Sequence, residues 1–140
     1  MQYSYWILPF FKIKEWFVVL LVQHVWWHRS FPKWHIESQE TPLQAAKREV
    51  FEEVWLDQID VLPNVYFDHY YSFFEKWGVL VNKRVGFFVG EVYDTTVVLQ
   101  KSELQDFCWK NIDDAMEILT FESDKNILKK AYEAINSTSN

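Results

Sequence analysis

The hydrophobic positions near the start of the chain fall into two runs with the character of strands. Residues 3–14 are aromatic and apolar with polar interruptions, which predicts a strand. The continuous apolar residues 17–22 predict a second strand, over 17–23, that is buried on both faces. Pro9 lies inside the first strand, where its missing N–H favours an edge or a bulge. Residues 24–39 have no clean period, so we expect a loop there.

The pattern changes to helical spacing after Thr41. Thr41 at the N-cap, Pro42 at the first helical position and Gln44 at the third form a capping box with a favoured proline. Apolar residues recur at helical spacing and form a stripe that we expect to face the core: Leu43, Ala46, Val50 and Val54. The opposite face carries charged residues: Arg48, Glu49, Glu52 and Glu53.

The rest of the chain predicts a hairpin, short strands and two helices. In chain order we expect strands at 59–74 and 79–93 around a turn at 75–78, short strands at 96–99 and 107–110, and helices at 113–119 and 124–136. Ser123 is the expected N-cap of the last helix, whose packing stripe is Ile127, Leu128, Ala131, Tyr132 and Ile135. This order of elements, with no linker or repeat, indicates one α+β domain over residues 1–140.

The composition agrees with one folded domain and limits the classes of partner that it could bind. Of the 140 residues, 49% are hydrophobic and 24% charged, which excludes intrinsic disorder. A net charge of −6 argues against non-specific binding to nucleic acid or to an anionic membrane. Cys108 is the single cysteine, which excludes an internal disulfide and fits a reducing, cytoplasmic location. The apolar runs are too short to cross a bilayer, so no membrane partner is expected.

The charged face of the first helix is the main indication of chemistry. At 100° per residue, Glu49, Glu52 and Glu53 fall within an arc of roughly 100°. Their mutual repulsion is relieved if a hard divalent cation such as Mg²⁺ binds among the oxygens and reaches substrate phosphates. Arg48 can hold a neighbouring carboxylate in a ligating orientation. On the helix alone, a solvated acidic face is the alternative.

A longer stretch carries a more specific signal. The residues WHIESQETPLQAAKREVFEEVWL, at 34–56, resemble the Nudix box. Seven of its nine defined positions are in register: Glu40, Arg48, Glu49, Val50, Glu52, Glu53 and Leu56. The two that differ are glycines in the pattern, and Trp34 and Trp55 stand in their places.

The resemblance implies an α/β/α sandwich around a mixed sheet and a hydrolytic activity. It implies Mg²⁺ or Mn²⁺ held by Glu49, Glu52, Glu53 and the backbone carbonyl of Trp34, and water that attacks a phosphorus of a nucleoside diphosphate linked to another group. Catalytic roles are implied for Glu52, Glu103 and Arg48, with Glu103 a base or an extra ligand. Phosphate contacts are implied for Lys33 and Lys83, and adenine stacking for Tyr71 or Phe74.

Within the family, the chain is most similar to the asymmetric diadenosine tetraphosphate hydrolases, through residues 31–33 and 102–109. The implied partner is a nucleotide substrate of a monomeric enzyme. Three alternatives stay open: an RNA 5′-pyrophosphohydrolase, which the acidic charge disfavours, a nucleotide-sanitising enzyme, and an inactive nucleotide-binding domain if Trp34 and Trp55 are genuine.

The chain contains 8 tryptophans and only 3 glycines. An average glycine content of roughly 7% would give about ten. Several tryptophans stand where the resemblance or a turn favours glycine, which suggests a UGA codon read as tryptophan in place of glycine. The hypothesis covers Trp6, Trp27, Trp34, Trp55 and Trp77. Trp109 is expected to be genuine, because relatives also carry tryptophan there.

Overall fold

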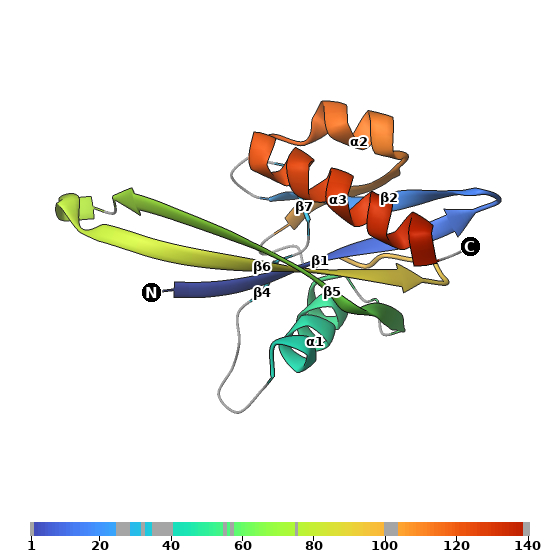
Figure 1. Cartoon of the computed structure of the whole chain (residues 1–140), viewed down its shortest axis with the longest axis horizontal. Helices are drawn as coiled ribbons and strands as arrows, with labels where there is room; N and C mark the ends of the chain where they lie inside the picture. The colour runs from blue at the N-terminus through green and yellow to red at the C-terminus, as the bar shows by residue number, and fades with distance from the viewer. Residues whose placement is uncertain are drawn as a thin grey trace.

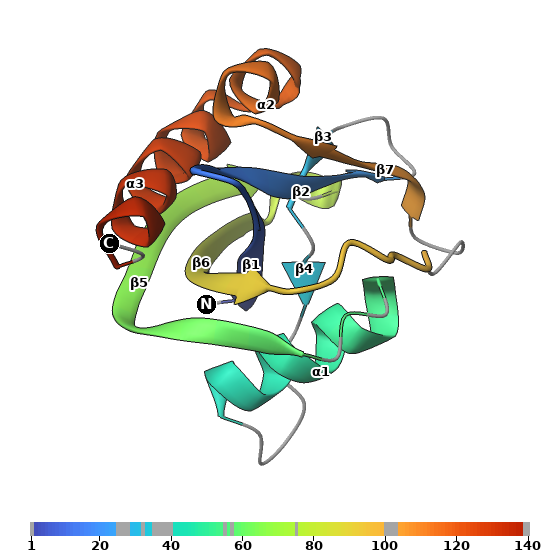
Figure 2. The same cartoon turned by 90° about the vertical axis from the view of Figure 1, so that its right-hand side faces the viewer.

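A mixed β-sheet lies between one helix on one face and two helices on the other (Figures 1 and 2). The computed structural model describes residues 2–24, 29–31, 33–34, 41–54, 56, 58–74, 76–99 and 104–138, without some of their side chains. The elements are β1 (Gln2–Ile13), β2 (Trp16–His24), β3 (Arg29–Ser30), β4 (Lys33–Trp34), α1 (Pro42–Val54), β5 (Ile59–Phe74), the 3-10 turn η1 (Lys76–Gly78), β6 (Leu80–Val92), β7 (Leu104–Lys110), α2 (Ile112–Ile118) and α3 (Glu122–Thr138). The expected α+β class and three-layer arrangement are confirmed.

Strand β1 is the centre of the sheet. It runs parallel to β6 along ten residue pairs, from Gln2 opposite Lys83 to Phe11 opposite Val92. On its other side it pairs with β4 at residues 5–6 and with β2 at residues 10–13, antiparallel in both cases. The described strands follow the order β3-β2-β1-β6-β5, with β7 added on β2. Both β4 and β6 are therefore held against the first half of β1.

Pro9 lies inside this central strand, so the expectation of an edge is wrong. The register with β4 ends at Trp6 and the register with β2 begins at Phe10, so Pro9 lies between the two antiparallel ladders. A missing N–H is tolerated at such a gap. On the β6 side Pro9 faces Gly90.

Two apolar cores fill the space on either side of the sheet. The α3-side core contains Leu8, Phe31, Phe87 and the buried stripe of α3. The α1-side core contains Tyr5, Ile7 and Val54. Strand β2 contributes alternate residues to both cores, which confirms its predicted burial on both faces. The α3 stripe is confirmed too, with Ile127, Leu128, Ala131 and Ile135 buried and Tyr132 partly buried.

Helix α1 begins with the predicted capping box. The backbone N–H of Gln44 donates to Oγ1 of Thr41 at 3.1 Å, and the backbone N–H of Thr41 donates to Oε1 of Gln44 at 3.0 Å. The predicted apolar stripe is correct at its end and wrong at its start, because Val54 is fully buried and Leu43 is 39% exposed. Figure 1 shows the reason, since the first turn of α1 lies farther from the sheet than the last. The side chains of Ala46 and Val50 lie outside the described residues.

Three boundaries differ from those the sequence predicts. The expected loop at 24–39 contains β3 and β4, which have two residues each and are too short to show a period. The expected strand at 96–99 is irregular, and the N–H of Val98 donates to the carbonyl of Val54 at the end of α1. Helix α3 begins at Glu122, so Ser123 is inside the helix and is not its N-cap.

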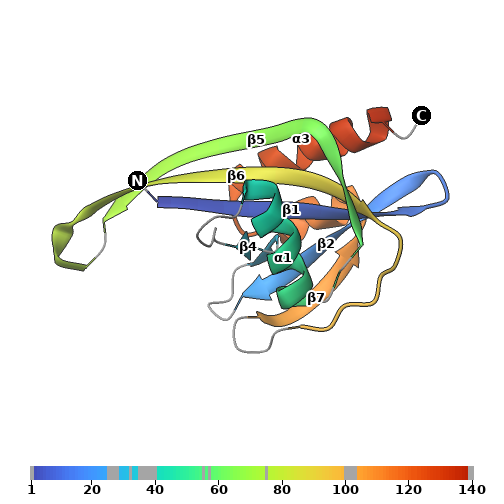
Figure 3. The same ribbon diagram turned by 90° about the horizontal axis from the view of Figure 1, so that it is seen from below.

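The hairpin of β5 and β6 confirms the predicted pair of long strands. Figure 3 shows that it extends beyond the rest of the sheet, with its turn far from the helices. Gly90 on β6 packs against the edge of the α1-side core, where an added Cβ would lie 2.6 Å from Cγ1 of the buried Ile59. Glycine at this position therefore allows the close approach of the two strands.

We predict that Gly90→Ala destabilises the protein by about 1–3 kcal/mol through overpacking against Ile59. The free energy of unfolding in urea, at equilibrium, measures the effect. In an Ile59→Ala background the same substitution should cost less, because the two side-chain atoms nearest the added Cβ are gone. Equal penalties in both backgrounds would contradict the assigned contact.

Candidate functional site

The backbone of α1 places the three candidate ligands on one arc of the helix. Positions 49, 52 and 53 lie in a continuous helix. At 100° per residue, the nearest of these positions is about 100° around the helix axis from the buried Val54. The three positions are therefore not on the side of the helix that packs on the core. The side chains of Glu49, Glu52 and Glu53 lie outside the described residues, whereas Arg48 is described and is half-buried.

This donor set fits a hard divalent cation. Carboxylate oxygens at positions i, i+3 and i+4 are the ligand type that Mg²⁺ and Mn²⁺ prefer, and their repulsion without a cation is costly. Among the side chains that the structure describes, no group of three or more His, Cys, Asp or Glu residues could hold a metal. The acidic arc of α1 is a candidate metal site on the type and spacing of its residues.

The short strand β4 connects this helix to the centre of the sheet. Its residue Trp34 pairs with Tyr5, and its residue Lys33 pairs with Trp6. Phe31, just before β4, is fully buried in the α3-side core and anchors this part of the chain. Strand β4, whose Trp34 carries the carbonyl expected to bind the metal, thus lies next to α1. The side chains of Lys33 and Trp34 lie outside the described residues.

Lys83 is placed on the α3 side of the sheet. It pairs with Gln2 on β1 and with position 71 on β5. Strand alternation puts it on the same face as Val85 and Phe87, and its side chain is 8% exposed. The side chain of Tyr71 lies outside the described residues, but its register position is directly opposite Lys83.

Phe74 is not brought to that face. It is three residues from position 71, so it points to the other side of the hairpin, where it faces Leu80 and is 72% exposed. Of the two proposed stacking residues, only position 71 shares a face with Lys83. Glu103 and Glu40 lie outside the described residues.

A polar cluster on the hairpin was not found from the sequence. Arg84 donates twice to the carboxylate of Asp68, from Nε to Oδ1 at 3.1 Å and from Nη2 to Oδ2 at 2.6 Å. Its guanidinium also lies 5.2 Å from the ring centroid of Tyr70. The hydrogen bonds from Arg84 hold the pKa of Asp68 below its usual value. Asp68 and Tyr70 have the i, i+2 spacing of one strand face, but their pairing with Arg84 depends on the register.

The hairpin has further polar contacts beside this cluster. Ser72 and Asn82 add a side-chain hydrogen bond of 2.6 Å nearer the turn, between Oγ and Oδ1. Burial, together with a hydrogen bond to Asp68, raises the pKa of Tyr66 well above its usual value. The hairpin therefore has a cross-strand polar network on the face opposite Lys83.

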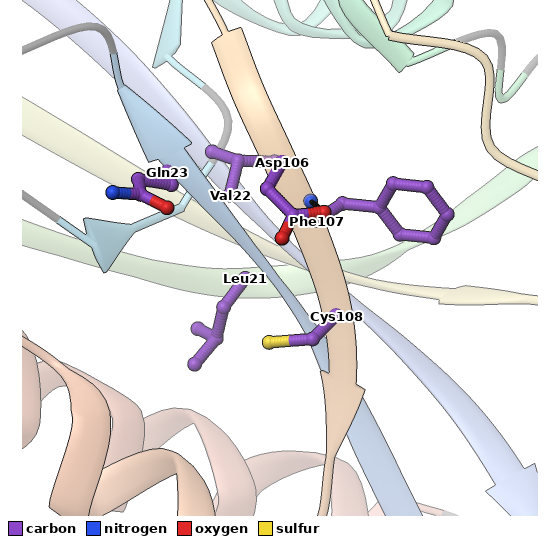
Figure 4. A pocket seen from close by; sticks show the side chains of 6 residues that line it. All are labelled: Leu21, Val22, Gln23, Asp106, Phe107 and Cys108. Atoms are coloured by element: carbon purple, nitrogen blue, oxygen red, sulfur yellow. Dashed lines mark hydrogen bonds between the residues drawn. The ribbon is translucent and has the colours of Figure 1, made fainter. Parts of the chain in front are cut away.

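A small pocket lies between β2 and β7. Figure 4 shows its lining, which is Leu21, Val22, Gln23, Asp106, Phe107 and Cys108. The two strands meet there in antiparallel register. None of the predicted site residues lines this pocket. Cys108 is partly buried and packs against the α3-side core, as expected for a structural cysteine.

The described tryptophans differ in how well their positions suit them. Trp109 is half-buried and its Nε1 donates to the carbonyl of Thr95 at 3.1 Å. Trp77 has φ of 73°, in the left-handed region that favours glycine, and its side chain is 98% exposed. Nε1 of Trp6 is buried and has no acceptor in the described part of the chain. Trp27 and Trp55 lie outside the described residues.

Comparison with known proteins identifies the family of the chain. The NUDIX domain model matches residues 6–131. The chain is 30% identical to the asymmetrical bis(5′-nucleosyl)-tetraphosphatase of Sus scrofa over 109 residues, which are 76% of this chain and 71% of that protein. The chain belongs to the Nudix hydrolases, which act on phosphoanhydride bonds. Members of this family typically depend on a divalent metal.

Solved structures show the same fold. An Ap4A hydrolase of C. elegans, in a binary complex, superposes with a TM-score of 0.82 at 22% identity, covering 99% of both chains. The dihydroneopterin triphosphate pyrophosphohydrolase of E. coli gives 0.74 at 18% identity, covering 94% of this chain and 95% of that chain. The NUDIX domain of Shewanella oneidensis NrtR, in complex with ADP ribose, gives 0.74 at 15% identity, covering 96% and 88%. None of the helices described is long and apolar enough to span a membrane.

We predict that Trp77→Gly stabilises the protein by about 0.5–1 kcal/mol. Glycine relieves the left-handed backbone, and the exposed indole contributes no packing. Urea denaturation measures the change. Trp16→Gly is the control, because Trp16 lies in the regular strand β2 with half of its side chain covered, and there glycine should destabilise. A loss of stability on Trp77→Gly would argue against a position suited to glycine.

Proposed function

We propose that the protein hydrolyses a dinucleoside polyphosphate such as diadenosine tetraphosphate to ATP and AMP. The observation that carries the proposal is the acidic arc of α1, in register with the Nudix box over residues 34–56. The 30% identity with an asymmetrical bis(5′-nucleosyl)-tetraphosphatase supports this choice of substrate. We assign the whole of residues 1–140 to one Nudix domain.

The carboxylates of Glu49, Glu52 and Glu53, with the carbonyl of Trp34, are the groups that would hold Mg²⁺ or Mn²⁺. Such an ion, when bound, polarises phosphoryl oxygens and lowers the pKa of a bound water. Arg48 orients a neighbouring glutamate through charge-assisted hydrogen bonds. Glu103, just before β7, accepts the proton of the attacking water or adds a ligand.

The reaction replaces one phosphoanhydride bond by one P–O bond from water. The water oxygen bonds to phosphorus, the bridging P–O bond breaks, and AMP and ATP separate while the water proton passes to the base. Lys33 and Lys83 neutralise phosphate charge. The chain must supply this positive charge locally, because its net charge is −6. Position 71 stacks on adenine, because it shares a strand face with Lys83, whereas Phe74 lies on the other face.

The experiment that tests this proposal compares diadenosine tetraphosphate with other candidate substrates of a phosphoanhydride hydrolase. The chain as written and a Trp34→Gly/Trp55→Gly variant are incubated with diadenosine tetraphosphate, with capped or triphosphorylated RNA, and with oxidised dGTP. Each reaction is run with Mg²⁺ and with EDTA. ATP plus AMP from the first substrate supports the proposal. Turnover of RNA or of oxidised dGTP alone favours an RNA pyrophosphohydrolase or a sanitising enzyme, and no turnover by either form favours an inactive binding domain.

We predict that Glu52→Gln lowers kcat by at least roughly 10²-fold, since a main electrostatic stabiliser of the transition state is lost. Chelation of the metal should abolish turnover of the unmodified chain. The control is Glu117→Gln, an exposed glutamate of α2 on the other side of the sheet. Near-normal activity of Glu52→Gln would refute the ligand assignment.

We predict that Lys83→Gln raises KM for the dinucleotide about tenfold or more, because one charge-assisted contact to phosphate is lost. Initial rates over a range of substrate concentrations measure KM and kcat separately. Because Lys83 is buried, the melting temperature of the variant is measured beside the rates. Lys130→Gln, at an exposed position of α3, serves as the control. An unchanged KM in a folded Lys83→Gln protein contradicts the assignment.

A further inference from the structure

We propose that the protein forms a two-fold symmetric dimer, in which the outer edge of β5 pairs antiparallel with the same edge of a second copy of this chain. The contact consists of residues 66–74 and is centred on Tyr70. The resemblance to known hydrolases implies a monomer, so the two expectations differ in a property that can be measured. The dimer does not depend on the proposed function.

Strand β5 is the open edge of the sheet. Among the described strands it pairs only with β6, so the backbone groups on its outer side have no strand partner there. Such an edge is a template for another chain, and proteins usually protect it with lysine, proline or a bulge. Pro63 and the shift in register between Val61 and Tyr66 protect the start of β5. Residues 66–74 contain neither lysine nor proline, and their turn end extends beyond the helices (Figures 1 and 3).

The sequence of this edge is symmetric about Tyr70. Read from either end, the run YFDHYYSFF at 66–74 gives two aromatic residues, then one polar residue, then a ring on each side of the central tyrosine. The backbone has the same midpoint, because the regular pairing with β6 covers 66–74, between the bulge and the turn. A two-fold axis through Tyr70 therefore brings residues of similar type opposite each other along the whole stretch.

This register aligns apolar positions on the face that carries Arg84. The axis places Phe74, which is 72% exposed, opposite Tyr66 of the second copy. Within one chain, Phe74 pairs with the exposed Leu80 on β6, and Tyr66 packs on Phe88 with ring centroids 5.1 Å apart. The dimer thus sets the exposed pair of each copy beside the aromatic pair of the other. Cross-strand contacts between aromatic side chains are favourable.

The charges along this edge are balanced within each copy. Asp68 is the only Asp, Glu, Lys or Arg among residues 66–74, and Arg84 forms an ion pair with it at 2.6 Å. The register sets Asp68 opposite Ser72 of the second copy, so no two carboxylates face each other. At the axis, Tyr70 meets its own counterpart. The edge therefore lacks the like-charge repulsion that would keep two copies apart.

The edge is long enough to hold a dimer together. In an antiparallel ladder, alternate residue pairs exchange two backbone hydrogen bonds each, so the stretch 66–74 provides about 8–10 of them. A typical protein–protein interface has roughly 10 direct hydrogen bonds. Because both copies use the same edge, the contact is isologous and closes at two subunits.

Sedimentation equilibrium of the full chain tests the dimer. We expect twice the mass of one chain at high protein concentration, and dissociation on dilution. Tyr70→Lys sets two lysines face to face at the axis, so it should raise the dissociation constant of the dimer at least roughly 100-fold. The control is Trp16→Lys, which adds the same charge at a half-exposed aromatic residue of β2 and should leave that constant unchanged. Circular dichroism shows whether each variant is folded.

Cysteine cross-linking tests the register, in a Cys108→Ala background that removes the native thiol. Tyr70→Cys brings two thiols together at the axis, where opposite Cα atoms lie about 4.5–5.5 Å apart, within the range of a disulfide. Ser72→Cys is the matched control, because its counterpart lies four residues along the ladder, about 13 Å away. We expect oxidised glutathione to cross-link the first variant and not the second.

A species with the mass of one chain at every concentration overturns the dimer and leaves the edge to an extended segment of another protein. A dimer that a folded Tyr70→Lys chain forms as tightly as the unmodified chain overturns β5 as the interface. If Tyr70→Lys does not fold, the cross-linking decides alone. Equal cross-linking of the two cysteine variants, cross-linking of Ser72→Cys only, or none in either contradicts the axis at Tyr70.

Discussion

The parallel pairing of β1 with β6 is the constraint on which the rest of the structure depends. Ten consecutive residue pairs bind these strands together, and each face of the pair supports a different layer. Tyr5 and Ile7 face the core beneath α1, while Trp6 and Leu8 face the core beneath α3. A shift of one residue would exchange the two faces. The register therefore determines which face of the sheet packs against the acidic helix and which face carries Lys83.

The candidate site residues are divided between the two faces of the sheet. The acidic helix lies on one face, and the position of Lys83 lies on the other. Strand β4 is the link, because its residues pair with Tyr5 and Trp6 and because it contacts α1. The buried Phe31 anchors β4 to the core.

Sequence patterns predicted the features that depend on residues close together in the chain. The capping box at Thr41, the apolar run of β2 and the stripe of α3 all express their structure within a few residues, and each is confirmed. What failed depends on tertiary placement. Leu43 has the right spacing for burial but lies in a turn of α1 that extends away from the sheet. Pro9 is accepted in a central strand only because two ladders end on either side of it.

The same distinction applies to the site. The spacing of Glu49, Glu52 and Glu53 is a local property of one helix, so the sequence could predict it. The strand register, which no local pattern contains, shows that position 71 and not Phe74 shares a strand face with Lys83. The ion pair of Asp68 with Arg84 joins residues on two strands and was missed for this reason. The indole of Trp6 has no acceptor for its Nε1 among the described residues, which only the packed structure reveals.

The central claim is that one arc of α1 binds a divalent cation between its carboxylates. Anomalous diffraction from crystals grown with Mn²⁺ and a non-hydrolysable dinucleotide tests this claim most directly. The account predicts a manganese peak within about 2.0–2.6 Å of carboxylate oxygens from at least two of Glu49, Glu52 and Glu53. Ordered carboxylates that diverge from one another, with no manganese on this arc, would contradict it.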